Sequence, residues 1–200
     1  MSCTVLGSRE TIARALATGL GAVICDLDAP LPSETEGVVI VVGIDPATEP
    51  SDTSTISATE WCRLAEEPMR RTLCALQRSR LSMRGPGGSI VLVAPTIGMA
   101  GAAGLVALTT AAEGIRAMAK SAARQWASEG IQINTIAVPM HVFAPALRTS
   151  ASHLTAAAVE DDDESLTESV VETTKFLLRR DLKHIVGETI IVDGGSVMLP

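Results

Sequence analysis

Short apolar runs alternate with longer stretches of helical period along this chain, and this alternation limits the folds open to it. The apolar runs are residues 4–6, 22–27, 37–42, 89–94, 131–137 and 188–192, and the helical stretches between them are 10–20, 57–83, 108–128 and 166–180. Fully apolar strands are typical of sheets covered on both faces. The order therefore predicts an α/β fold with a doubly wound parallel sheet, in one domain over residues 1–200.

Local signals support these boundaries. Ser57 precedes Glu60 by three residues, which is the capping-box spacing at the start of a helix. In the 108–128 helix an apolar stripe predicts the face toward the sheet, and its residues are Ile115, Met118, Ala119, Ala122 and Trp126. Residues 140–163 have no regular pattern and are predicted to form a mobile loop, and the acidic run 161–164 is interpreted as solvated.

Composition excludes several classes of function. The 200 residues carry a net charge of −7, whereas nucleic-acid binding needs a basic face. No apolar stretch is long enough for a membrane span, and the first residues lack a signal-peptide pattern, so a cytoplasmic protein without membrane partners is predicted. The cysteines and histidines lack metal-ligand spacing, which predicts free thiols and no metal site; they are Cys3, Cys25, Cys62, Cys74, His141, His153 and His184.

Three segments of the second half resemble the short-chain dehydrogenase/reductase family. They read GSIVLVAP at 88–95, ARQWASEGIQINTIAVP at 123–139 and GETIIVDGG at 187–195, in the order and spacing of that family. The resemblance covers residues 37–200 and is weaker before them. It implies a Rossmann-like fold and, for intact members, NAD(P)-dependent oxidation or reduction of an alcohol or ketone.

The resemblance also implies where the catalytic residues of such an enzyme would stand. The family uses a Tyr, a Lys four residues later, a Ser and an Asn. Counting back from Asn134, and aligning around Trp61 for the last position, places Leu108, Ala112, Pro95 and Pro68 there. None of these side chains can transfer a proton, and the chain has no Tyr at all. No catalytic residue is therefore predicted.

Three residues are possible substitutes for the missing groups. Thr96 or Thr110 offers a hydroxyl, but its pKa suits proton transfer poorly. Lys120 lies two helical turns beyond Ala112, about 12 Å along the axis, which is too far for a simple replacement. A self-sufficient reductase would need such a substitute, and it is the least favoured of three hypotheses for the function.

The dinucleotide site also departs from the family. In the first turn Gly7 is kept, whereas Glu10 and Ile12 are predicted to stand at the second and third glycines, against the phosphates. Asp26 or Asp28 follows the second strand and could hold a ribose, although a polar strand end is the favoured interpretation. About ten residues then separate that strand from the next, so the fold is predicted to be truncated by about one αβα unit, and the chain to bind no cofactor.

These losses suggest a subunit that does not catalyse. The leading hypothesis is an inactive family member paired with an active paralogue in a heterodimer or heterotetramer, with NAD(P) bound by the partner. Residues 197–200 are a further candidate contact. The predicted interface residues are Met69, Leu73, Leu76, Ala111, Ile115, Met118, Ala122 and Trp126. The alternative is a stand-alone small-molecule binding or sensor protein that uses the old substrate cleft near Pro95, Leu108 and residues 140–147.

Overall fold

A parallel sheet of six strands forms the centre of the computed structural model, which describes residues 2–8, 12–46, 48–151, 157–159 and 162–198. The strands are β1 (Cys3–Leu6), β2 (Val23–Cys25), β3 (Gly37–Val41), β4 (Gly88–Pro95), β5 (Ile131–Val138) and β6 (Thr189–Ile191). They lie in the order β2-β1-β3-β4-β5-β6, and every neighbouring pair is parallel. The predicted doubly wound parallel sheet is confirmed.

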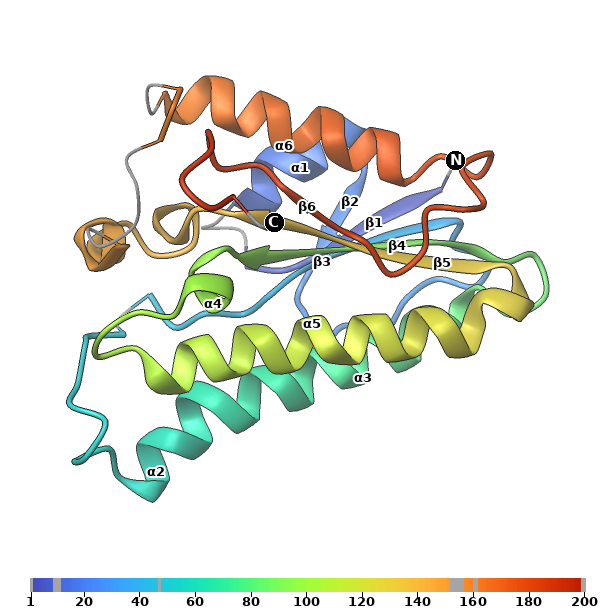
Figure 1. The fold of residues 1–200 in the computed structure, drawn as a ribbon. Coiled ribbons are helices and arrows are strands. Elements are labelled where there is room, and N and C mark those ends of the chain that lie inside the picture. The colour runs from blue at the N-terminus through green and yellow to red at the C-terminus, as the bar shows by residue number, and fades with distance from the viewer. Residues whose placement is uncertain (1, 9–11, 47, 152–156, 160–161, 199–200) are drawn as a thin grey trace.

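Two layers of helices cover the two faces of the sheet (Figure 1). Helices α1 (Ile12–Leu20) and α6 (Asp163–Leu177) pack on one face, where Leu16 and Val170 belong to the same buried cluster. Helices α3 (Glu67–Ser82) and α5 (Val106–Trp126) pack on the other, where Leu76 and Ile115 are fully buried. Because both faces are covered, β3 and β4 are buried along their whole length, as their unbroken apolar sequences predict.

The long helical stretch after residue 57 is built from three segments. Ser57 caps α2 (Ala58–Trp61), because its hydroxyl accepts a hydrogen bond from the Glu60 amide at 3.1 Å. A π-helical segment, Cys62–Glu66, follows and leads directly into α3. The N-cap prediction is confirmed. The π segment had one sequence signal, Pro68, which lacks the amide that a continuous α-helix would use.

The acidic run has a role that its interpretation as a solvated loop does not include. Helix α6 begins at Asp163, three residues before the predicted start. The Asp162 side chain accepts a hydrogen bond from the Glu164 amide at 3.0 Å and caps the helix. Asp163 and Glu164 occupy the first turn, where negative charge is favourable. Asp161 lies outside the described residues.

The segment after β5 is more regular than predicted. Residues 140–151 form two 3-10 segments, Met140–Val142 and Pro145–Ala151. Their apolar side chains are anchored in the core cluster that contains α1 and α6, and they are Met140, Phe143, Ala144 and Leu147. The mobility predicted for residues 140–163 stays a prediction, and His153 lies outside the described part.

The predicted truncation is visible between β2 and β3. Residues 26–36 connect them through turns, with neither helix nor strand, so β2 is the edge of the sheet. Val23 on this edge is 65% exposed. Across the described part of the chain, no helix combines the length and the apolar character that crossing a membrane requires.

Candidate functional site

A pocket lies at the carboxyl ends of β3 and β4, between α5 and the junction of the π segment with α3. Its volume is about 330 Å³ with the open mouth included. Carboxyl ends of parallel strands are the usual binding edge of such sheets. The lining residues are Val42, Gly43, Ile44, Asp45, Thr48, Arg63, Leu64, Pro68, Pro95, Leu108, Ala111 and Ala112.

The pocket brings together the four positions at which the family keeps its catalytic side chains. Pro95 ends β4, Pro68 lies in the first turn of α3, and Leu108 and Ala112 lie one turn apart on α5. All four line the same pocket. The alignment that placed them is therefore consistent with the geometry, and their side chains give this part of the wall an apolar surface with no hydroxyl, amide or ammonium group.

The short helix α4 (Ile97–Ala100) packs against one side of the position where the family places its lysine, which is Ala112. A Cβ atom added to Gly98 would lie 2.8 Å from the Ala112 Cβ, so the backbone of α4 already packs against this residue. Ala112 is 4% exposed. A lysine side chain at this position would have to displace α4 or fill the pocket.

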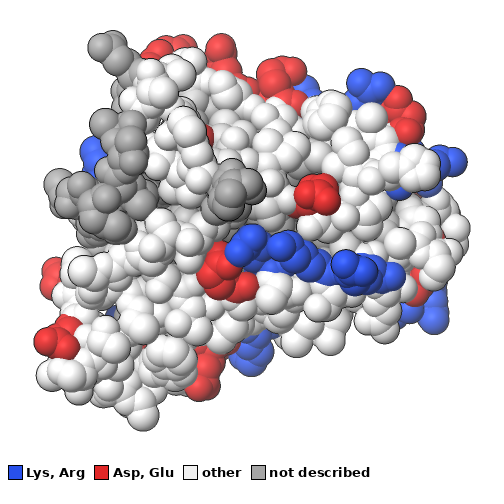
Figure 2. Space-filling model, viewed as in Figure 1, with Lys and Arg blue, Asp and Glu red and all other residues white. Residues whose placement is uncertain are grey.

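The substitutes that the sequence suggested are not brought to the pocket. Thr96 and Thr110 are absent from the lining that the described residues form. Lys120 is exposed on α5, four residues from both Arg116 and Arg124. Figure 2 shows a row of lysine and arginine side chains across this face of the molecule. No observation therefore supports a substitute proton donor built from these three groups.

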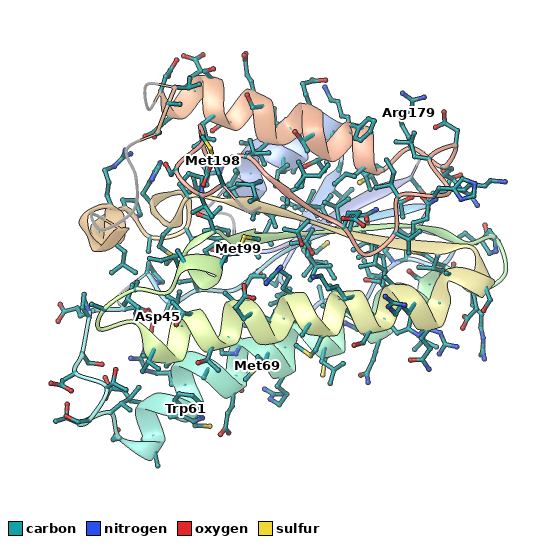
Figure 3. All side chains as sticks on the ribbon, viewed as in Figure 1. Asp45, Trp61, Met69, Met99, Arg179 and Met198 are labelled. Atoms are coloured by element: carbon teal, nitrogen blue, oxygen red, sulfur yellow. The ribbon has the colours of Figure 1, made fainter. Side chains whose placement is uncertain are left out.

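The mouth of the pocket is formed by the loop that follows β3. Asp45 accepts a hydrogen bond from Arg63, and the Thr48 hydroxyl donates one to the Asp45 carbonyl oxygen at 2.7 Å. The Ser51 amide donates to the Gly104 carbonyl at 2.8 Å. These bonds hold the loop between the π segment and the amino-terminal end of α5 (Figure 3).

The first turn keeps Gly7 for packing. A Cβ atom on Gly7 would lie 2.9 Å from the Val41 Cβ and 3.1 Å from the Ala13 Cβ, so a side chain there would push α1 and β3 apart. The prediction that Ile12 stands against the phosphates is wrong: Ile12 is 6% exposed and packs in the core. Counted from Gly7, the family pattern places Thr11 and Ala13 at the second and third glycines, and residues 9–11, with Glu10, lie outside the described part.

The two acidic candidates for a ribose contact are placed differently. Asp28 accepts a hydrogen bond from Arg71 Nε at 2.9 Å, and Asp26 is exposed beyond β2. Asp28 is thereby tied to α3. The Arg71 contact makes Asp28 less available to a ribose hydroxyl.

Two polar residues of the family pattern are retained, and both hold the backbone. Asn134, 3% exposed, donates to the Ile185 carbonyl at 2.8 Å and accepts from the Glu188 amide at 3.0 Å. The Asp193 carboxylate, in a residue 5% exposed, accepts from three amides, those of Gly195 at 2.9 Å, Ser196 at 3.2 Å and Val197 at 2.9 Å. These contacts fix β6 and the turn after it.

The predicted interface residues differ in how far they are buried within the chain. Four serve the interior of the chain, which corrects their assignment as contacts: Leu76, Ile115 and Trp126 are in the core, and Ala111 is buried and lines the pocket. Leu73 is 41% exposed on α3. Met69, Met118 and Ala122 are half-buried, and a Cβ atom on Gly114 would lie 2.6 Å from the Met69 sulfur, which shows how closely α3 and α5 approach.

The cysteines are free thiols, as predicted. Burial raises the pKa of Cys3 on β1 to about 11, so its nucleophilic thiolate is scarce at neutral pH. Within the described residues, histidine, cysteine and acidic side chains form no group of three or more arranged to hold a metal ion.

Comparisons with known proteins agree with the fold. A family model described as enoyl-(acyl carrier protein) reductase matches residues 12–197. The chain therefore belongs to the short-chain dehydrogenase/reductase family, whose characterised members are oxidoreductases. Among solved structures it is similar to a levodione reductase, with a TM-score of 0.76 and 16% identity over 97% of this chain and 96% of that one. No curated protein matches it in sequence.

Proposed function

We propose that this chain is a non-catalytic subunit that assembles with an active member of its family, which binds NAD(P) and oxidises or reduces an alcohol or ketone. The observation that carries the proposal is the pocket in which Pro68, Pro95, Leu108 and Ala112 stand at the catalytic positions. The proposed location of the assembly is the cytoplasm.

The polar groups that remain in the pocket suit the family's reaction poorly. That reaction needs a phenol whose proton is made mobile by a nearby ammonium group, and the chain has no Tyr. The charged side chains in the lining are Asp45 and Arg63, which bond to each other at the mouth. Their place at the rim supports a binding surface more than a proton relay.

The outer face of α3 and α5 is the proposed contact surface. Leu73 is an exposed apolar side chain on α3, and Ala117 and Ser121 are small exposed residues on α5. Small side chains let a second helix pair approach closely, and an exposed leucine gives that contact apolar area. Met69, Met118 and Ala122 remain at the edge of this surface.

The test is recovery of the tagged chain from its native host, with mass analysis and an NAD(P)H assay of what comes with it. We expect an intact family member at equal ratio, with the activity traced to that partner. Leu73→Glu is expected to lose the partner, because a charge would be buried in the contact. Val23→Glu, on the exposed edge strand, is the matched control and is expected to keep it.

Two results would contradict this proposal or its contact surface. If the purified chain alone binds NAD(P)H and turns over a ketone, the chain holds a proton donor of its own and the subunit proposal fails. If Leu73→Glu and Val23→Glu both keep the partner, the contact lies on another surface.

A second candidate is a stand-alone small-molecule binding or sensor protein. The observation that favours it is the same pocket, because its volume of about 330 Å³ remains open although its catalytic side chains are gone. A ligand recovered with the purified chain in the absence of any partner would support this function over the first.

A further inference from the structure

The pocket joins an apolar interior to one basic group. Its aliphatic and proline walls come from the loop after β3, the π segment, α3, β4 and α5, and they are Val42, Ile44, Leu64, Pro68, Pro95, Leu108, Ala111 and Ala112. Among the described residues in the lining, Arg63 is the single lysine or arginine. A ligand that fits this surface has an apolar body and a polar group at one end.

The hydrogen bonding of the ion pair decides the charge of that polar group. Within the described residues, the Arg63 guanidinium makes one hydrogen bond, from Nη1 to the Asp45 carboxylate. Nε and Nη2 therefore keep N–H donors for a second acceptor. Asp45, in contrast, has further interactions, and its backbone carbonyl accepts from Thr48. The pair is better prepared for an added anion than for an added cation.

The exposure of the pair makes this exchange feasible. The Arg63 side chain is 48% exposed and that of Asp45 is 36% exposed, so solvent and solutes reach the guanidinium from the mouth. Exposed ion pairs contribute little net stability, so rearranging this one costs little. A carboxylate is an acceptor that guanidinium binds through two parallel N–H···O bonds, and it is smaller than a phosphate.

The geometry points to a site for a small apolar carboxylate, with its ring or short chain against Pro95 and Leu108 and its carboxylate on Arg63. The open volume of about 330 Å³ includes the mouth of the pocket, so it sets an upper limit on the ligand, which is one ring or a short chain. This inference deepens the binding function given above as the second candidate, and it is independent of the subunit proposal.

The experiment compares two probes with the same body and different heads, 4-(trifluoromethyl)benzoate and 4-(trifluoromethyl)benzamide. Their binding to the full chain is measured by ¹⁹F NMR titration at pH 7. We expect the carboxylate to bind about tenfold more tightly than the amide, because hydrogen bonds to a charged group are the stronger ones. The Arg63→Gln variant is expected to bind both probes equally.

Two further variants keep the result specific. Leu108→Trp fills the pocket and is expected to abolish binding of both probes, and circular dichroism checks that it folds. Arg70→Gln removes an exposed arginine on α3 that is absent from the lining and bonds to Glu67, so it is expected to keep the full preference. An unchanged preference in Arg63→Gln overturns the assignment of the carboxylate to Arg63.

The outcomes separate this inference from the functions proposed above. Equal binding of the two probes by the unmodified chain overturns the carboxylate site but leaves a binding function. If neither probe binds, the proposed site is overturned, and the pocket no longer supports a stand-alone binding protein. Partner recovery from the host tests the subunit proposal in every case.

Discussion

The pocket at the ends of β3 and β4 and the turn after β6 derive from the same family pattern but keep different parts of it. In the pocket, the catalytic positions are occupied by Pro68, Pro95, Leu108 and Ala112. Around β6, Asn134 and Asp193 keep their family identity, and each bonds to backbone groups. The retained residues are therefore those on which the fold depends, since buried backbone groups without hydrogen-bond partners lower the stability of the folded state.

The largest loss of stability is expected for a charge introduced in the wall of the pocket. Ala112→Lys would place an ammonium group in the apolar wall of the pocket, at a residue that is 4% exposed and packs against Gly98 of α4. We expect the free energy of unfolding to fall by about 4 kcal/mol, because an unpaired buried charge is poorly solvated. Urea denaturation measures it, with Ala117→Lys on the exposed face of α5 as the control. Equal stability of the two variants would mean that the family's lysine position is still open.

The next largest loss of stability is expected at Asp193, which keeps its family identity. Asp193→Ala removes the acceptor of three backbone amides in the turn after β6. We expect a loss of about 3 kcal/mol in unfolding free energy, as hydrogen bonds to charged groups are strong and their removal leaves buried donors unpaired. Asp181→Ala, at an exposed aspartate bonded to Arg179, serves as the control in thermal and urea unfolding. A loss no larger than that of the control would show that this turn does not depend on the carboxylate.

Asn134→Ala is expected to have a somewhat smaller effect, about 2 kcal/mol, because it leaves one carbonyl and one amide of residues 185–188 without a partner. Hydrogen exchange of the Glu188 amide is the local readout and should accelerate. Gln132→Ala, on the same strand and half-buried, provides the comparison. Unchanged exchange at Glu188 would argue against the structural role of Asn134.

The smallest change in stability is expected when two of the family's catalytic side chains are restored in the pocket. Leu108→Tyr with Pro95→Ser returns two family side chains to the pocket, whose volume can take part of the added tyrosine. We expect the unfolding free energy to change by about 1 kcal/mol and NAD(P)H consumption to stay at background, because Ala112 supplies no ammonium group. Measurable turnover by this double variant would mean that a tyrosine and a serine at these two positions are enough for activity.

Several features of the fold were predictable because they rest on local signals. Unbroken apolar runs indicate the strands, and Ser57 with Glu60 indicates the start of α2, where their hydrogen bond is present. The start of α6 was not predictable in the same way, since a run of aspartates resembles a solvated loop until one of them is seen to cap a helix. The π segment was also missed, although Pro68 within a helical stretch is the residue that marks it.

The candidate site was predictable in part. Counting along the family pattern identified Pro68, Pro95, Leu108 and Ala112, which the structure gathers in one pocket. The ion pair of Asp45 and Arg63 was not found, because the two residues are 18 positions apart and no motif joins them. The helical period of α3 and α5 likewise showed an apolar stripe without showing which of its residues stay at the surface.

The class of fold, the shortened connection after β2 and the lack of a tyrosine can all be found from the sequence, because each depends on residue type and spacing along the chain. The tertiary structure decided which side chains meet. It turned Ile12 into the core, placed α4 against Ala112 and left Arg63 at the mouth of an apolar pocket. These contacts join elements that are distant in sequence, and close packing between elements leaves no local trace in the pattern of residues.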